Sequence, residues 1–328
     1  MTRSLSMCNV QAFACVMLIA WASAACHAQP YPSKPIRLMM PYPAGGSTDI
    51  VGRLIAERLT AALKQAVVVE NRPGASAQIG TEAAAKAPAD GYTLLMATST
   101  NAINQALNPN LPYDFPKEFQ PIALIANAGQ VLVVHPSLPA RSVREFIALA
   151  KARPGQLAYA SSGAGTSGHL AMEALSSAAK IKLLHVPYKG NAPALNDLLG
   201  GQVTCGFANV VSVLPQVKAG RLRALGISSV KRSALAPDVP TIAEAGFADF
   251  DISAWFAIMA RAEVPAAIIA RLNQEIAQIL SSSETQEKLL SYGLDPSPLR
   301  STKEFADFLQ ADMRRWAKLA KEAQLTSP

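Results

Sequence analysis

The sequence predicts a mixed α/β protein of two lobes, joined by two crossing segments and with a ligand cleft between them. Strand and helix patterns alternate through most of the chain, the alternation restarts near residue 131, and the chain becomes mainly helical after residue 260. Strands alternating with helices of about 10–15 residues indicate βαβ units and a parallel sheet covered on both faces. We expect the late helices to return to the first lobe. This places the crossings near 126–131 and 248–254, and the lobes at 29–128 with 252–328 and at 129–251.

The expected elements follow in order along the chain. Each strand is a run of apolar residues, and each helix shows apolar residues at helical spacing. Ser142 with Glu145, and Ser301 with Glu304, form capping boxes that start two of the helices. The predicted strands are 35–42, 66–71, 92–99, 131–137, 156–162, 181–188, 202–209, 221–229 and 252–260, and the main helices are 49–63, 77–87, 143–152, 168–179, 265–280, 284–292 and a long one after Ser301.

The first 28 residues have the pattern of a secretory signal peptide. Arg3 is their only charged residue, and the apolar stretch 12–25 is too short to span a bilayer as a lone helix. Small Cys26 and Ala28 stand at the −3 and −1 positions of a cut before Gln29. We therefore predict a periplasmic protein that begins at Gln29. A lipoprotein acylated at Cys26 is the alternative.

Charge and cysteine usage exclude several classes of protein. Without Arg3 the chain carries 29 basic and 23 acidic residues, a net charge of +6, and the basic residues are scattered without interleaved aromatic residues. Such a pattern argues against a nucleic-acid partner. Cys205 is the only cysteine after Cys26, so no internal disulfide is possible and the apolar core must stabilise the fold.

The loop "GAGTSG" at 163–168 matches the spacing G-x-G-x-x-G of a dinucleotide site. That site also needs an acidic residue at the end of the next strand, and none lies between Glu173 and Asp197. A hydrolase elbow G-x-S-x-G would need glycine where His169 stands. The four histidines and Cys205 show no metal-ligand spacing. We predict no catalytic residue, no metal and no cofactor.

Two glycine loops predict an anion site instead. "PYPAGGSTD" at 41–49 and "SGAGTSG" at 162–168 each follow a strand and open a helix. The first amides of a helix lack intrahelical partners, and the helix dipole adds partial positive charge there. Gly45 and Gly46 permit close approach of the backbone. Two such loops facing one cleft from opposite lobes would hold a small carboxylate.

A series of motifs in this order resembles one family. The motifs are "YPSKPIRLMMPYPAGGSTDIVGRL", "VVVENRPGA", "APADGYTLLMATST", "LPYDFPKEFQPIALIA", "YASSGAGTSGHLAMEAL", "HVPYKGNAPALNDLLGGQV", "AGRLRALGISSVKRS", "PDVPTIAEAG" and "FADFLQADMRRW". The chain resembles the extracytoplasmic solute receptors of tripartite tricarboxylate transporters, the Bug receptor family. The resemblance implies a type II periplasmic-binding-protein fold, a small organic carboxylate ligand, a membrane permease as partner, a monomer, and no enzyme activity.

The resemblance also implies which residues contact the ligand. Both glycine loops grip a carboxylate, residues at the end of the third strand complete the grip, and Tyr188 and Asn209 face the rest of the ligand. Ala208 departs from the family pattern, in which an acidic residue is frequent, so the far wall is not predicted. Thr100 follows Ser99 at the end of the third strand. The expected ligand-binding residues are Tyr42, Ala44, Gly45, Gly46, Ser47, Thr48, Ser99, Ser162, Gly163, Gly165, Thr166, Ser167, Tyr188 and Asn209.

Other interpretations stay open for several residues. Tyr188 can pack under the hinge, Lys189 can be a solvated surface charge, and His169 and His185 can be structural. Asp49 is expected to support the start of its own helix. Two functions also remain as alternatives: an exported sensory receptor that feeds a sensor kinase, and a secreted enzyme on the same fold.

Overall fold

A computed structural model gives the fold, and it describes residues 31–322 except 109, 230, 234 and 249. The predicted signal peptide, with Cys26 and the expected cut before Gln29, lies outside the described residues. Contacts divide the chain into Met1–Ser33 and Lys34–Pro328, and the description below concerns the second unit. Among the described helices, none is both long and apolar enough to cross a membrane.

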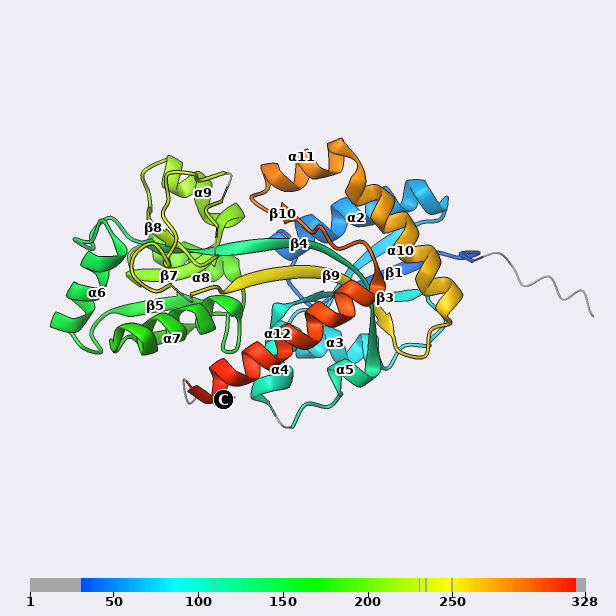
Figure 1. The fold of residues 1–328 in the computed structure, drawn as a ribbon, viewed down its shortest axis with the longest axis horizontal. Helices are drawn as coiled ribbons and strands as arrows, with labels where there is room; N and C mark the ends of the chain where they lie inside the picture. The colour runs from blue at the N-terminus through cyan, green and yellow to red at the C-terminus, as the bar shows by residue number, and fades with distance from the viewer. Residues whose placement is uncertain (1–30, 109, 230, 234, 249, 323–328) are drawn as a thin grey trace, which may run out of the picture. The chain divides into compact units, whose positions relative to one another are not determined.

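One sheet of ten strands runs through this unit, in the order β2-β1-β3-β9-β4-β7-β5-β6, with β10 and β8 also paired to β4 (Figure 1). The two outer trios, β2-β1-β3 and β7-β5-β6, are parallel, whereas β4, β8, β9 and β10 pair antiparallel. The strands are β1 Ile36–Met40, β2 Val67–Asn71, β3 Thr93–Thr98, β4 Phe119–Val134, β5 Ala158–Ser161, β6 Leu184–Pro187, β7 Cys205–Asn209, β8 Arg223–Ile227, β9 Ser253–Arg261 and β10 Asp295–Pro296.

The long strand β4 belongs to both lobes. Its first part pairs with β9 as far as Gly129 opposite Ser253, and from Gln130 it pairs with β7 and β8 instead. We call the elements around the β9-paired part the first lobe and those around the β7-paired part the second lobe. Two chain segments, one in β4 and one leading into β9, therefore connect the lobes.

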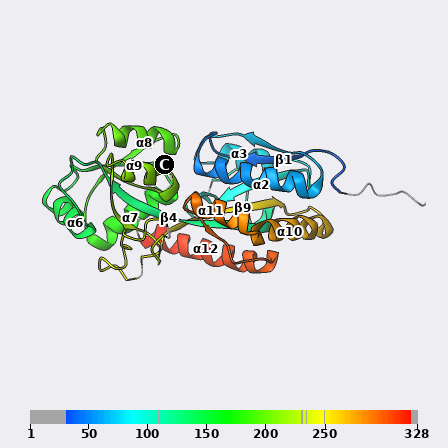
Figure 2. The same ribbon diagram turned by 90° about the horizontal axis from the view of Figure 1, so that it is seen from above.

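Helices cover both parts of the sheet, as Figure 2 shows from above. The first lobe carries α2 Ser47–Leu63, α3 Gln78–Ala85, α4 Ser99–Leu107, α5 Phe115–Glu118, α10 Ala266–Ser281, α11 Ser283–Ser291 and α12 Thr302–Glu322. The second lobe carries α6 Val143–Ala152, α7 Ser167–Ala179, α8 Asn191–Leu199 and α9 Val210–Lys218. The C-terminal helices do return to the first lobe, where α10 packs on α2 and β4, and α12 packs on α4 and β4.

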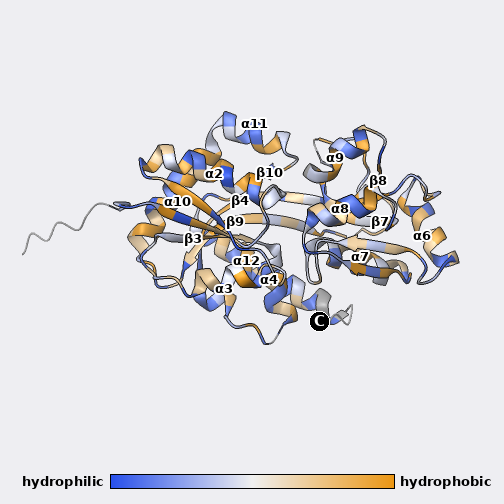
Figure 3. Cartoon of the chain, turned by 180° about the vertical axis from the view of Figure 1, so that it is seen from behind, coloured by the Kyte–Doolittle hydropathy of each residue, from blue (hydrophilic) through white to orange (hydrophobic). Residues whose placement is uncertain are grey.

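Amphipathic spacing explains the docking of the late helices. In α10 the buried residues Ile269, Leu272, Ile276 and Leu280 recur every three or four positions, so they form one apolar face. The alternation of apolar and polar colour along α10 is visible in Figure 3.

Local capping chemistry sets the start of two helices. Ser301 and Glu304 form the predicted capping box of α12, since the Glu304 N–H donates to the Ser301 hydroxyl at 3.1 Å and the Ser301 N–H donates to the Glu304 carboxylate at 2.9 Å. At α6, Ser142 accepts from the Glu145 N–H at 3.2 Å, but the Glu145 carboxylate accepts from the N–H of Arg141. Only half of the box predicted for α6 therefore forms.

Several predicted boundaries were wrong. The strand expected at 131–137 begins at Phe119, because residues 119–130 pair with β9 before the chain enters the second lobe. The strand expected at 92–99 ends at Thr98, and Ser99 and Thr100 open helix α4 rather than close the strand. Helices α4 and α5 and strand β10 were not predicted. The strand expected at 181–188 is limited to β6.

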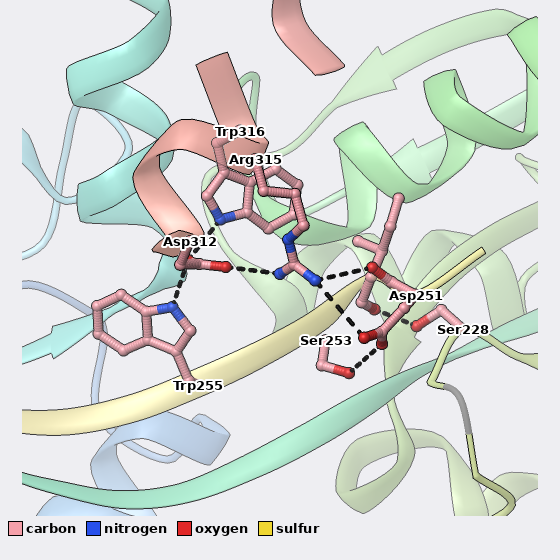
Figure 4. A network of polar contacts seen from close by, with 8 residues as sticks. Ser228, Asp251, Ser253, Trp255, Asp312, Arg315 and Trp316 are labelled. Carbon is pink, nitrogen blue, oxygen red and sulfur yellow. Dashed lines mark hydrogen bonds and ion pairs between the residues drawn. The ribbon is translucent and has the colours of Figure 1, made fainter. Parts of the chain in front are cut away.

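A buried carboxylate fastens α12 to β9 beside the second crossing (Figure 4). Asp312 is 4% exposed and accepts from the indole N–H of Trp255 in β9 at 2.7 Å and of Trp316 at 2.7 Å. The Arg315 guanidinium donates to the same carboxylate at 2.6 Å and to the backbone carbonyl of Asp251 at 3.0 Å. The network thus ties the C-terminal helix to the segment that connects the lobes.

Candidate functional site

A cavity of about 240 Å³ is lined by residues from both lobes. Ten of the residues expected to bind ligand line it, together with Thr100. Lys189 is the only charged residue in its lining, and none of the described lining residues is acidic. The lining consists of Tyr42, Pro43, Ala44, Gly46, Ser47, Thr48, Thr98, Ser99, Thr100, Ala254 and Phe256 from the first lobe, and Ser162, Thr166, Ser167, Lys189, Gly190, Asn191, Ala192, Pro193 and Asn209 from the second.

Five helices begin at this cavity. Their N-cap residues all belong to its lining: Gly46 for α2, Thr98 for α4, Thr166 for α7, Gly190 for α8 and Asn209 for α9. Each helix start contributes partial positive charge, and four of the five have no side-chain cap on their first amides. At α4 the Thr98 hydroxyl already accepts from the Thr100 N–H at 3.3 Å. Because none of the described lining residues is acidic, these five starts make the cavity favourable for a negatively charged ligand.

Asp49 stabilises the first glycine loop from the side opposite the cavity. This buried carboxylate accepts from the Gly45 N–H at 3.0 Å, from Arg53 at 2.8 Å and from Asn71 at 2.9 Å. Burial alone would raise the pKa of Asp49, but these hydrogen bonds outweigh it and lower the pKa. The Gly45 amide therefore serves the loop and does not line the cavity. No side chain caps α2, so its first amides remain open to another partner.

In the second glycine loop, too, some backbone amides bond within the lobe and other residues line the cavity. The Gly163 N–H donates to Ser161 at 3.2 Å and the Gly165 N–H donates to Nδ1 of His169 at 3.0 Å, and neither glycine lines the cavity. Both need a positive φ, of 135° and 73°. Thr166 and Ser167 follow them and do line the cavity. The two glycines therefore shape the loop, and the residues after them face the cavity.

Gly168, the last glycine of the G-x-G-x-x-G match, has a packing role. A Cβ at this position would lie 2.5 Å from the backbone oxygen of Phe207, so only glycine allows α7 to approach β7 this closely. The spacing that suggests a dinucleotide site thus arises from loop shape and helix–strand packing.

Hydrogen bonds join the lobes across the cavity. Asn209 donates its side-chain amide to the hydroxyl of Ser47 at 2.9 Å, and it accepts from the side chain of Gln130 in β4. In the first lobe, the Tyr42 hydroxyl lies 2.5 Å from the Thr98 hydroxyl. Gln130 is 2% exposed, and nothing local in its sequence context predicted this role.

Comparison with known proteins identifies the family. Residues 51–325 match the model of the tripartite tricarboxylate transporter family receptor. The chain belongs to this family. Protein BugT of Bordetella pertussis is 38% identical to this receptor over 324 residues, which cover 98% of each chain.

Solved structures share the receptor's fold as well as its sequence. Rpa4515 of R. palustris, solved with adipate, has a TM-score of 0.87 and 35% identity, and the match covers 90% of the receptor and 99% of that chain. MatC of Rhodopseudomonas palustris, solved with bound malate, has a TM-score of 0.83 and 29% identity, with 88% and 99% covered. The receptor therefore has the two-lobed fold of periplasmic binding proteins, as predicted.

In the receptor, the Tyr188 side chain forms its hydrogen bond outside the cavity. Its hydroxyl donates to the Asp197 carboxylate in α8 at 2.7 Å, and Tyr188 is not part of the lining. Burial and this carboxylate raise the pKa of Tyr188 to about 12. The nearby residues Gly190 and Asn191 line the cavity instead and form a third loop at a helix start. In the sequence, the only indication of this loop was a glycine placed just before a helix.

A larger hollow lies elsewhere in the second lobe. It has a volume of about 720 Å³ and is lined by residues around Arg141, Arg223 and Glu244. None of the residues predicted to bind ligand lines it.

Two histidines stack behind the second glycine loop. The rings of His169 and His185 lie 4.1 Å apart at 10°, and Tyr159 stacks on His185 at 4.8 Å. His169 accepts from Gly165, and His185 bonds to the Ser161 hydroxyl at 2.7 Å. Burial lowers the pKa of each histidine to about 4, and at His185 the neighbouring His169 contributes to this lowering. Both are therefore neutral supports of the loop, in agreement with the structural interpretation.

We expect this stack to make the receptor less stable in mild acid. Because the folded pKa of about 4 lies below the ordinary value of 6.5, the unfolded chain binds protons between these values that the folded chain does not. The free energy of unfolding should fall as the pH drops from 6.5 towards 4. The measurement is urea unfolding at several pH values. The double variant His169→Gln/His185→Gln should have a shallower pH dependence, whereas His135→Gln, outside the stack, should keep the wild-type slope. Equal slopes for all three proteins would contradict the assignment.

Proposed function

We propose that this receptor binds a small organic carboxylate in the cavity between its lobes. The observation that carries the proposal is the convergence of five helix starts on a cavity with no acidic lining residue. Amides and hydroxyls can bind a carboxylate without a charged partner. The adipate and malate held by two relatives of the same fold support the same ligand class.

The proposed ligand contacts come from both lobes. Gly46, Ser47 and Thr48 offer amides or hydroxyls from α2, and Ser99 and Thr100 do so from α4. From the second lobe, Ser162, Ser167 and Asn209 face them. Thr166 also lines the cavity, but its hydroxyl donates to the Gly163 carbonyl at 2.8 Å, so it contributes the start of α7 rather than a free hydroxyl donor. We place the lobe boundaries at 128/129 and 251/252. The first lies one residue before β4 changes partner, between Gly129 and Gln130, and the second lies just before β9 begins at Ser253. The lining residues that the structure describes include no pair of groups that would act as acid and base on a bound carboxylate, so we propose binding without turnover.

In the cell the receptor would act in the periplasm and deliver its ligand to a tripartite tricarboxylate permease. The signal-peptide pattern of residues 1–28 and the family membership support this location and partner. Genes for a large and a small permease subunit beside the receptor gene would favour transport. A neighbouring sensor-kinase gene alone would favour sensing.

A thermal-shift panel tests the ligand class. The panel contains citrate, malate, adipate, aspartate and benzoate, with the uncharged amide of each as control. A ligand present at one hundred times its Kd should stabilise the fold by about 2.7 kcal/mol. We expect at least one acid, and none of the amides, to raise the melting temperature. A panel in which no acid raises it would contradict a carboxylate receptor.

Ligand binding should close the lobes and change the tryptophan fluorescence. Apart from Trp21 in the predicted leader, the tryptophans of the chain are Trp255 and Trp316, and both donate to Asp312 beside the crossing. Hinge closure around a ligand alters such a segment while secondary structure persists. Small-angle scattering should show a smaller radius of gyration with ligand, together with unchanged circular dichroism. An unchanged radius at saturation would contradict hinge closure.

The exported protein should begin at Gln29 without a lipid. Cleavage after Ala28 follows from the small residues at the −3 and −1 positions. Intact-mass spectrometry of protein purified from the periplasm measures this directly. A mass that includes acyl chains on Cys26 would show a lipoprotein instead.

A further inference from the structure

The turn between β2 and α3 has an unusual backbone. Ala75, Ser76 and Ala77 have φ values of 45°, 49° and 73°, so three successive residues with side chains lie in the left-handed region. L-residues other than glycine, and to a lesser degree asparagine and aspartate, avoid this region, and those that enter it do so singly. A conformation of this kind persists only where surrounding contacts hold it.

Contacts of Ser76 supply that support, and one of them crosses between the lobes. The Ser76 hydroxyl donates to the backbone carbonyl of Ala164 in the second lobe at 2.8 Å. The Ser76 carbonyl accepts from the side chain of Asn104 in α4 at 2.7 Å. The turn is thus anchored to its own lobe through Asn104, and it reaches the opposite lobe through the hydroxyl.

Two glycines of the second glycine loop leave room for this turn. A Cβ at Gly163 would lie 3.3 Å from the Ser76 hydroxyl, and a Cβ at Gly165 would lie 3.3 Å from the Asn104 side chain. Both distances are tighter than an ordinary van der Waals contact. The absence of side chains at these two positions therefore permits the first lobe to approach.

The peptide between Ala164 and Gly165 is held from both lobes. Its carbonyl accepts from Ser76 of the first lobe, and its N–H donates to His169 of the second lobe at 3.0 Å. Thr166 and Ser167, which line the cavity, follow immediately in the chain. The orientation of this peptide, and with it the position of these two residues, is coupled to the first lobe through a single hydroxyl.

We infer that the turn 75–77 is a latch between the lobes and that Ser76 is a positioning residue of the binding site. The latch stabilises the closed arrangement of the lobes and so slows ligand dissociation. It does not contribute to the initial binding of ligand to the open receptor. Ligand retention rests on the proposed function, but the preference for the closed arrangement does not require any ligand.

A matched pair of variants in the same turn tests the latch. Ser76→Ala removes only the hydroxyl, and residue 76 must still adopt the left-handed backbone conformation. Ala75→Gly removes a methyl group from an exposed residue, relieves the left-handed conformation and leaves the hydroxyl. Ser76→Gly is the third variant, and because it lacks the hydroxyl on a relaxed backbone it should behave as Ser76→Ala does. Thermal unfolding followed by circular dichroism establishes that each variant is folded.

Two readouts separate a latch from general support of the fold. The radius of gyration is measured by small-angle scattering, without added acid and with excess adipate as the probe. The association and dissociation rates of adipate are measured by stopped-flow tryptophan fluorescence. For Ser76→Ala and Ser76→Gly we expect a larger radius and a dissociation rate raised about three- to tenfold, the net effect of one neutral hydrogen bond. The association rate should stay within about twofold, and Ala75→Gly should match the wild type.

Equal radii for wild type and Ser76→Ala under both conditions would overturn the latch. So would a loss of affinity that appears only in the association rate. If adipate and the other acids of the thermal-shift panel fail to bind the wild type, the proposed function falls, and the radii of the unliganded proteins alone then decide the latch.

Discussion

Replacing the ligand's carboxylate by a primary amide should weaken binding to this receptor about a hundredfold or more. The amide keeps the shape of the acid but removes the charge, and it turns one acceptor into a donor that meets the N–H groups at the helix starts. A hydrogen bond to a charged group contributes about 1.5–3 kcal/mol, and each helix start about 0.3–1 kcal/mol. Loss of two such contacts corresponds to at least the stated factor. Isothermal titration calorimetry with the acid identified by the thermal-shift panel, and with its amide, measures the difference.

The variant Gly46→Asp should cause a similar loss from the protein side. Gly46 has a φ of −81°, and a Cβ there would meet only the Pro43 carbonyl, at 3.8 Å, so the fold accepts a side chain. An aspartate would place a carboxylate among the amides that the ligand uses. Gly46→Asn, which has nearly the same size without the charge, is the matched control and should bind more tightly than Gly46→Asp. An amide that binds within threefold of the acid, or equal losses in the two variants, would contradict recognition of the charge by helix starts.

Asp312→Ala should be the most destabilising single change in the hinge region. It leaves two buried indole N–H groups and the Arg315 guanidinium without the carboxylate that they share. A buried donor left without its acceptor costs about 1–3 kcal/mol, and two such indole N–H groups are affected here. We expect a loss of about 3 kcal/mol or more in the free energy of unfolding, measured by urea denaturation.

Asp307→Ala is the matched control on the same helix. Asp307 forms an ion pair with Lys303 at 2.7 Å, and its side chain is 64% exposed. Exposed pairs of this spacing contribute only about 0.3–0.5 kcal/mol. If both alanine variants lose the same stability, the buried network around Asp312 does not stabilise the hinge.

The local features of this chain were predictable from the sequence. The strand-to-helix passage from β1 to α2 and the capping box of Ser301 and Glu304 follow from periodicity and from contacts within a few residues. The return of the C-terminal helices to the first lobe was inferred from the order of the elements along the chain. The same holds for the failure of "GAGTSG" as a dinucleotide site, since the required acidic residue is absent from the sequence itself.

Other features were decided by partners distant in the chain. The amides of Gly45 and Gly165 were expected to face a ligand, but they bind Asp49 and His169, which the loops bring back to them. Strand β4 extends back to Phe119 because β9, more than a hundred residues later, offers it a partner. Periodicity along one segment reports which face is buried, but not which remote strand completes the hydrogen bonds.

The sequence by itself determined an α/β receptor with two glycine loops suited to an anion. Only the tertiary structure decided that the starts of α4, α8 and α9 join those of α2 and α7 around one cavity, and that Asn209 and Ser76 each bond to the opposite lobe. The physical reason is that a helix start has a local sequence pattern, whereas its direction is set by the sheet that carries it. In that sheet, neighbouring strands such as β4 and β9 can be more than a hundred residues apart in the chain.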